Sequence, residues 1–152
     1  MPLLLLKVNR LSAVFWDVDG TLADTEMDGH RPAFNMAFQE LDLPFVWDEA
    51  LYNRLLAIPG GLRRVKLHAE TCGVHLSKNQ LDQVRDRKRV HYLERVRQGH
   101  VHLRPGVKRL LEELNRAGVQ QWIVTSSGSA SVMAMLEQIQ KQIPSFDGVV
   151  TS

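Results

Sequence analysis

Cysteine, long apolar runs and an excess of one charge are all nearly absent from this chain of 152 residues. The single cysteine, Cys72, excludes an intramolecular disulfide, so we expect a cytoplasmic protein, with Cys72 buried beside Gly73 at a helix end. The apolar residues 1–6 stop at Lys7, which is too short for a membrane span, and we expect them to pack near the first strand. A net charge of +2 gives no reason to expect a nucleic-acid partner.

The most informative segment covers residues 13–22, where an apolar strand runs into two carboxylates. Residues 13–16 predict a buried strand, after which Asp17 and Asp19 stand one residue apart before Gly20 turns the chain. Because side chains alternate along a strand, both carboxylates leave it pointing roughly the same way. This pattern suits a nucleophile beside an acid/base and a hard cation such as Mg2+. Taken alone, it fits a solvated turn at a strand end equally well.

A helical block follows this strand and extends to about residue 100. Apolar residues recur at helical spacing over residues 27–42, and Asp48 is placed to cap a second helix. A third helix is expected over residues 62–72, and Ser77 with Gln80 predicts a capping box for a fourth. We therefore expect an α-helical cap domain over residues 24–101.

The rest of the chain alternates helices and strands. A helix is expected from residue 105 to Gly118, followed by a strand over 120–125, a helix over 129–140 and a strand over 148–151. A strand, a helical insertion and then alternating helices and strands predict an α/β fold. We expect a Rossmann-like parallel sheet, incomplete at the C-terminus, formed by residues 1–23 and 102–152.

The second predicted strand ends in Thr125, Ser126 and Ser127. Hydroxyls and free backbone N–H groups at a strand end, just before a helix N-terminus, can bind a phosphate group. Taken alone, a plain loop of small residues explains this segment better.

Residues 17–21, Asp-Val-Asp-Gly-Thr, resemble the first motif of the haloacid dehalogenase superfamily. The resemblance implies that Asp17 attacks phosphorus and becomes an aspartyl-phosphate, while Asp19 protonates the leaving oxygen and then deprotonates water. It also implies Mg2+ bound by the Asp17 carboxylate and the Asp19 carbonyl. Thr125 matches the second motif best, with Ser126 as the alternative if the register shifts by one.

The helical insertion is similar to the cap of the CbbY-type branch, which contains xylulose-1,5-bisphosphate phosphatases and neighbours β-phosphoglucomutase. This similarity runs over nearly all of the chain. It implies substrate contacts by cap residues Asp24, Glu26, His30, Arg31, Gly60, Gly61 and Arg64. Backbone N–H groups at the Gly60–Gly61 turn, with charge from Arg63 and Arg64, suit a second phosphate. Leu62 and Arg63 replace a lysine and a glutamate of the branch, which leaves the exact substrate open.

Two further parts of the superfamily site have no match in these residues. One is a lysine that balances the phosphoryl charge, and the other is a late acidic pair that completes the Mg2+ shell. No lysine follows Lys141, and no acidic pair follows Asp147. We therefore expect an N-terminal portion of a longer phosphatase, negligible turnover by the 152 residues alone, and an open apolar edge at residues 13–16.

The resulting hypothesis is a Mg2+-dependent phosphatase that hydrolyses a small sugar phosphate, such as a pentulose bisphosphate, through an aspartyl-phosphate. We expect the complete protein to be a monomer without membrane or nucleic-acid partners. Two alternatives stay open: a phosphomutase similar to β-phosphoglucomutase, and a truncated non-catalytic module that binds a sugar phosphate.

Overall fold

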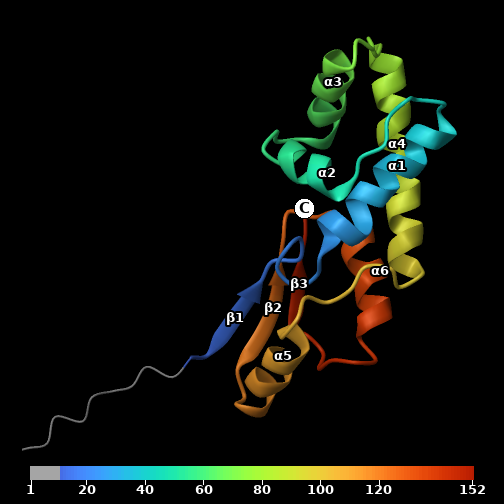
Figure 1. The fold of residues 1–152 in the computed structure, drawn as a ribbon. Coiled ribbons are helices and arrows are strands. Elements are labelled where there is room, and N and C mark those ends of the chain that lie inside the picture. Colours follow the sequence, from blue (N-terminus) through green and yellow to red (C-terminus); the bar gives the residue numbers. More distant parts are fainter. Residues whose placement is uncertain (1–10) are drawn as a thin grey trace, which may run out of the picture.

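The computed structural model describes residues 11–152, so the expected packing of residues 1–6 lies outside it. Its helices and strands follow the predicted order (Figure 1). They are β1 (Ala13–Trp16), the π-helix η1 (Thr25–His30), α1 (Arg31–Glu40), α2 (Glu49–Leu55), α3 (Gly61–Thr71), α4 (Lys78–Arg97), α5 (Val107–Arg116), β2 (Gln120–Val124), α6 (Ser129–Ile139) and β3 (Gly148–Val150).

The three strands form one parallel sheet in the order β1-β2-β3. Ala13 lies opposite Gln120 in the first pair, and Trp122 lies opposite Gly148 in the second. The strands point toward the helices of the insertion, so their carboxyl ends meet beneath α1 and α4 (Figure 1). The predicted α/β fold with a parallel sheet and an inserted helical block is confirmed.

The insertion is helical throughout, and its caps agree with the sequence. All of residues 25–97 are described, and no strand lies among them. The Asp48 side chain accepts a hydrogen bond from the Leu51 N–H at 2.7 Å, and Ser77 forms the predicted capping box with Gln80. These side chains satisfy backbone N–H groups that the first turn of a helix leaves without a partner.

The start of the first cap helix differs from the prediction of one regular helix over residues 27–42. The chain opens as η1 and becomes α-helical only at Arg31, with Pro32 in the first turn of α1. Gly29 lies so close to α4 that a Cβ atom there would be 2.7 Å from Cε2 of Tyr92. A glycine is therefore required at this position for η1 to pack so closely against α4. No local sequence pattern predicts this contact.

Two chain connections join the sheet to the helical insertion, and they run side by side. Ala23 and Leu103 form an antiparallel bridge. The Asp24 N–H donates to the His102 carbonyl at 3.2 Å, and the Arg104 N–H donates to the Leu22 carbonyl at 2.9 Å. These bonds hold the entry and exit of the insertion together directly above the strand ends. The division into domains at residues 24 and 101 stays a prediction.

Buried apolar side chains form two clusters. One lies between the sheet, α6 and the base of α4, and it includes Trp16, Leu22, Tyr92, Leu111 and Ile123. The other lies inside the helical insertion and is dominated by aromatic side chains: Phe34, Phe38, Phe45, Trp47 and Tyr52. Each part of the molecule thus buries its own apolar residues.

The outer edge of β1 is exposed, as the sequence predicted. Among residues 11–152, β1 pairs only with β2, and Phe15 on β1 is 68% exposed. The prediction that Cys72 is buried is wrong, because this residue follows the last turn of α3 at the surface. Within the same described residues, no helix has the length and apolar character needed to cross a membrane.

Candidate active site

The first part of the site lies where β1 and β2 end. Asp17 directly follows β1 and is exposed, whereas Asp19 is half-buried in the turn behind it. The Ser127 hydroxyl, from the loop after β2, donates a hydrogen bond to the Asp19 carboxylate. The Ser127 N–H in turn donates to the Thr125 hydroxyl at 3.2 Å. The structure therefore joins one predicted catalytic carboxylate directly to Ser127 and, through Ser127, to Thr125.

Backbone hydrogen bonds fix this loop to the end of the sheet. The Thr125 N–H donates to the Val150 carbonyl at 3.1 Å, which continues the β2–β3 pairing. The Ser126 carbonyl accepts a hydrogen bond from the Ser152 hydroxyl at 2.9 Å. Ser126 itself is exposed, whereas Thr125 and Ser127 are half-buried beside Asp19. Of the two alternatives for the second motif, Thr125 is therefore better placed than Ser126.

The strand ends offer oxygen donors of the kind that Mg2+ prefers. Asp17 and Asp19 supply carboxylates close together at the end of β1. Among residues 11–152, no group of three or more acidic, histidine or cysteine side chains is placed to hold a metal ion. The donor chemistry of this pair fits Mg2+, but the pair accounts for only part of an octahedral shell.

The second part of the site is a cavity of about 230 Å³ in the helical insertion. Most of the cap residues predicted to bind substrate contribute to its wall: Glu26, His30, Gly60, Gly61 and Arg64. They come from two separate segments, η1 and the start of α3. Gly60 has a φ of +86°, in the left-handed region that favours glycine, and this conformation turns the chain into α3.

Lys88 on α4 is a charged residue of this site that the sequence did not reveal. Its Nζ donates to Nδ1 of His30 at 2.9 Å and lies 5.1 Å from the ring centroids of both Phe34 and Tyr92. Burial lowers the pKa of Lys88 to about 8, an effect that Glu26 and Asp19 oppose. Lys88 is 58 residues from His30 along the chain, and no local signal distinguishes it from its charged neighbours on α4.

His30 is held as a neutral acceptor by this lysine. Burial, followed by the charges of Lys88 and Arg64, lowers the pKa of His30 to about 3. Because an ammonium group can only donate, Nδ1 of His30 accepts and its proton stays on Nε2. Nε2 is therefore available as a hydrogen-bond donor, while the positive charge in this part of the cavity belongs to Lys88.

Arg64 is buried and already engaged by the protein. Its Nε donates to the Leu55 carbonyl at 3.0 Å, and one terminal nitrogen donates to the Ile58 carbonyl at 3.3 Å. The other donates to the Tyr52 hydroxyl at 3.2 Å, and that hydroxyl donates to the Glu26 carboxylate at 2.6 Å. Burial and this hydrogen bond raise the pKa of Tyr52. Arg64 thus fixes the turn before α3 and, through Tyr52, the orientation of Glu26.

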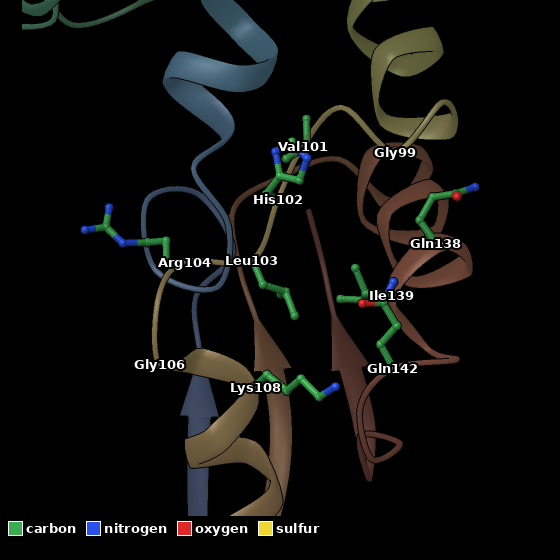
Figure 2. Close-up of a pocket in the computed structure, with 10 residues that line it drawn as sticks. All are labelled: Gly99, Val101, His102, Leu103, Arg104, Gly106, Lys108, Gln138, Ile139 and Gln142. Atoms are coloured by element: carbon green, nitrogen blue, oxygen red, sulfur yellow. The ribbon is translucent and has the colours of Figure 1, made fainter.

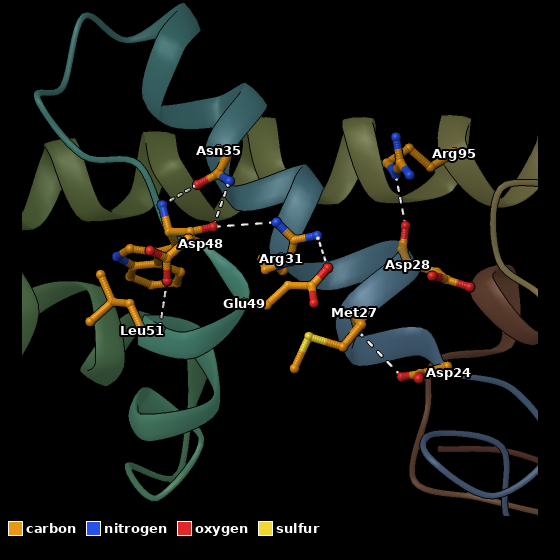
Figure 3. A network of polar contacts seen from close by, with 10 residues as sticks. Asp24, Met27, Asp28, Arg31, Asn35, Asp48, Glu49, Leu51 and Arg95 are labelled. Atoms are coloured by element: carbon orange, nitrogen blue, oxygen red, sulfur yellow. Dashed lines mark hydrogen bonds and ion pairs between the residues drawn. The ribbon is translucent and has the colours of Figure 1, made fainter.

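Asp24 and Arg31 are not among the residues that line this cavity, and Figure 3 shows the polar contacts that they make instead. The Asp24 carboxylate accepts from the Met27 N–H at 3.4 Å and caps η1. The Arg31 guanidinium donates to the Trp47 carbonyl at 3.5 Å and to the Glu49 carboxylate at 3.4 Å. Both side chains stabilise the fold of the cap, and their predicted contact with substrate stays a prediction.

A further cavity of about 350 Å³ lies beneath the two connections, away from the predicted site (Figure 2). Its wall is formed by the exit connection, by the start of α5 and by α6, and none of the predicted site residues belongs to it. Arg104, one of its cations, points away from the other labelled side chains (Figure 2). The candidate site therefore consists of the strand ends and the cap cavity.

Comparison with known sequences identifies the family of the chain. The family model of haloacid dehalogenase-like hydrolases matches residues 14–152. The chain belongs to this family. It is 42% identical over 135 residues to the plasmid-encoded protein CbbY of Cupriavidus necator, an alignment covering 84% of this chain and 52% of that protein. It is 36% identical to CbbY of Rhodobacter capsulatus, covering 84% of this chain and 56% of the relative.

Solved structures of the family have the same fold. CbbY from Rhodobacter sphaeroides in complex with phosphate superposes with a TM-score of 0.69 at 28% identity, covering 94% of this chain and 64% of that one. A mutant of that protein, in complex with xylulose-(1,5)bisphosphate, gives a TM-score of 0.69 at 27% identity, with the same coverage. This chain spans about half the length of the curated relatives that it matches. The activity of the whole protein is therefore a proposal.

Proposed function

We propose that this chain carries the nucleophile and the substrate cavity of a Mg2+-dependent phosphatase that acts on a small sugar phosphate, in particular a pentulose bisphosphate. The observation that supports the proposal is the hydrogen bond from the Ser127 hydroxyl to the Asp19 carboxylate, with Ser127 in turn bonded to Thr125, at the ends of adjacent parallel strands. It is supported by 42% identity to a CbbY protein and by likeness to a CbbY structure containing xylulose-(1,5)bisphosphate.

In this proposal, an oxygen of the Asp17 carboxylate attacks phosphorus and the bond from phosphorus to the sugar oxygen breaks. Asp19 gives its proton to that leaving oxygen and then takes a proton from the water that attacks the aspartyl-phosphate. The Thr125 hydroxyl and the Ser126 N–H hold the phosphoryl oxygens, while the Ser127 hydroxyl donates to Asp19. Mg2+ bound by Asp17 and the Asp19 carbonyl would supply positive charge at the same oxygens.

The cap contributes binding and orientation in this scheme. Glu26, held by Tyr52, accepts hydrogen bonds from sugar hydroxyls, and Nε2 of His30 donates one. Lys88 supplies the positive charge nearest to the strand ends. The family resemblance implies a further lysine and an acidic pair that the 152 residues do not contain, so we expect this chain alone to bind the substrate with negligible turnover.

Calorimetric titration of the chain with xylulose 1,5-bisphosphate in Mg2+ tests the proposal. We expect saturable binding that Thr125→Val weakens about tenfold, because a hydroxyl that donates to a phosphate oxygen is lost without a change in shape. Thr71→Val, at the exposed end of α3, is the matched control and should leave affinity unchanged. Absence of binding would refute the proposal. In an assay of the whole protein, conversion to an isomeric phosphate without release of phosphate would identify a phosphomutase instead.

A further inference from the structure

Lys88 and His30 stand between two cavities. The first is the cavity of about 230 Å³ near Gly60 and Gly61, which we call the cap lobe. The second, of about 590 Å³, lies between α4 and the start of α6, and we call it the α6 lobe. His30 and Lys88 line both lobes. A substrate that binds beside this pair can therefore extend into either lobe, and its second phosphate must occupy one of them.

The charges of the two lobes differ. The cap lobe contains the Glu26 carboxylate, and the nearby Arg64 already donates to two carbonyls and to Tyr52. The α6 lobe is lined by the cationic side chains of Arg85, Lys88 and Arg89, and its described wall, which also includes Ser152, contains no acidic side chain. A dianionic phosphate is repelled by the carboxylate of the first lobe and attracted by the cations of the second.

Within the α6 lobe, Arg89 has the freest guanidinium. Arg85 is held by Asp82 at 2.8 Å and by Asp86 at 2.9 Å. Among residues 11–152, Arg89 forms no ion pair and no hydrogen bond through its side chain. It is exposed and follows Lys88 directly on α4. A guanidinium in this state can bind two phosphate oxygens without first breaking a contact within the protein.

The opposite wall of the α6 lobe complements this arginine. Gly128, Ser129 and Ser131 line it, and no side chain caps the start of α6. A Cβ atom built on Gly128 would meet no atom within 4 Å, so the space in front of this turn is open. Unpaired N–H groups at the start of an eleven-residue helix add to the attraction that Arg89 provides for an anion.

We propose that Arg89 is a specificity-determining residue that binds the second phosphate of a sugar bisphosphate in the α6 lobe. This inference rests on the proposed function and adds the position of the far phosphate, which family resemblance alone would place at Gly60 and Gly61. Arg89 binds this phosphate from the cap, and the start of α6 binds it from the core. The second phosphate therefore joins the two parts of the molecule, whereas a monophosphate lacks this contact.

Titration of wild type and Arg89→Gln with xylulose 1,5-bisphosphate and with inorganic phosphate tests this inference. We expect Arg89→Gln to weaken bisphosphate binding about tenfold, and less at high salt, while phosphate binding at the strand ends stays unchanged. Arg97→Gln is the control, because it makes the same charge change on the same helix, eight residues away and outside the lobe. Arg89→Lys should restore part of the loss.

The outcomes separate this inference from the proposed function. If wild type binds neither probe, the proposed function fails and the inference fails with it. If wild type binds the bisphosphate and Arg89→Gln binds it equally well, the inference alone is wrong. A loss of bisphosphate binding in Arg63→Gln in place of Arg89→Gln would put the far phosphate in the cap lobe and would also overturn the inference.

Discussion

The strand ends and the cap contribute opposite chemistry to one site. The strand ends supply carboxylates and hydroxyls through Asp17, Asp19, Thr125 and Ser127, and no cation of the core touches them among the described residues. The cap supplies positive charge, in particular Lys88, whose pKa is lowered by burial but raised by the charge of Asp19. Among residues 11–152, the cap therefore contributes a positive charge that the side chains at the strand ends do not supply.

The largest effect should come from removing that cation. Lys88→Gln takes away the buried positive charge beside His30, and we expect sugar-bisphosphate affinity to fall by about 10- to 100-fold. Lys78→Gln at the exposed start of α4 is the control and should bind as wild type does. Titration calorimetry measures both variants. Equal affinity of Lys88→Gln and wild type would mean that the core binds phosphate without help from the cap.

The pH dependence of binding should follow the same group. The pKa of Lys88 is lowered to about 8, so the ammonium form is complete below that pH and is lost above it. We expect anion affinity to be highest below pH 8. It should decline as the pH rises through about 8 to 9, because a bound phosphate raises the pKa of Lys88 above its value of about 8 in the free protein. Lys88→Arg should remove this decline, because guanidinium does not titrate there. A flat profile in wild type would contradict this assignment.

A smaller effect is expected inside the cap. Tyr52→Phe removes the hydroxyl that donates to Glu26 at 2.6 Å and accepts from Arg64 at 3.2 Å. We expect the free energy of unfolding to fall by about 2 kcal/mol, the value of a hydrogen bond to a charged group. Tyr92→Phe is the matched control, since the Tyr92 hydroxyl has no hydrogen-bond partner among residues 11–152. Urea unfolding compares the two, and equal losses would show that the Tyr52 hydroxyl has no special role.

Local rules of the sequence predict much of this arrangement. The capping residues Asp48 and Ser77 act as expected, because a cap depends on only three or four neighbouring residues. The contact between Asp19 and the loop after β2 also follows from sequence, because the carboxyl ends of adjacent parallel strands meet at one edge of the sheet. These features need no knowledge of how distant helices pack.

The features that the sequence did not predict depend on packing over long distances. Lys88 is one of several basic residues on α4, and only the contact of that helix with η1 and α1 selects it for burial. The sequence alone is equally consistent with a solvent-exposed Arg64. Only the packing of α2 and α3 places three hydrogen-bond acceptors around its guanidinium. The π-helical start of the cap similarly reflects the close approach of Gly29 to Tyr92. The composition of the cap predicts its helices but not which charges face the site.

The central claim is that Asp17 is the nucleophile of a phosphate site at the strand ends, and a trapped phosphoryl analogue tests it without requiring turnover. Beryllium fluoride bonds to carboxylate oxygens in place of a phosphoryl group. Fluorine NMR of the chain with Mg2+ and beryllium fluoride therefore detects this analogue when it is bound at the site. We expect a protein-bound signal that is lost in Asp17→Asn and retained in Asp42→Asn, whose left-handed turn on the far side of the cap accepts asparagine. A bound signal that survives in Asp17→Asn, or the absence of one in wild type, would contradict the claim.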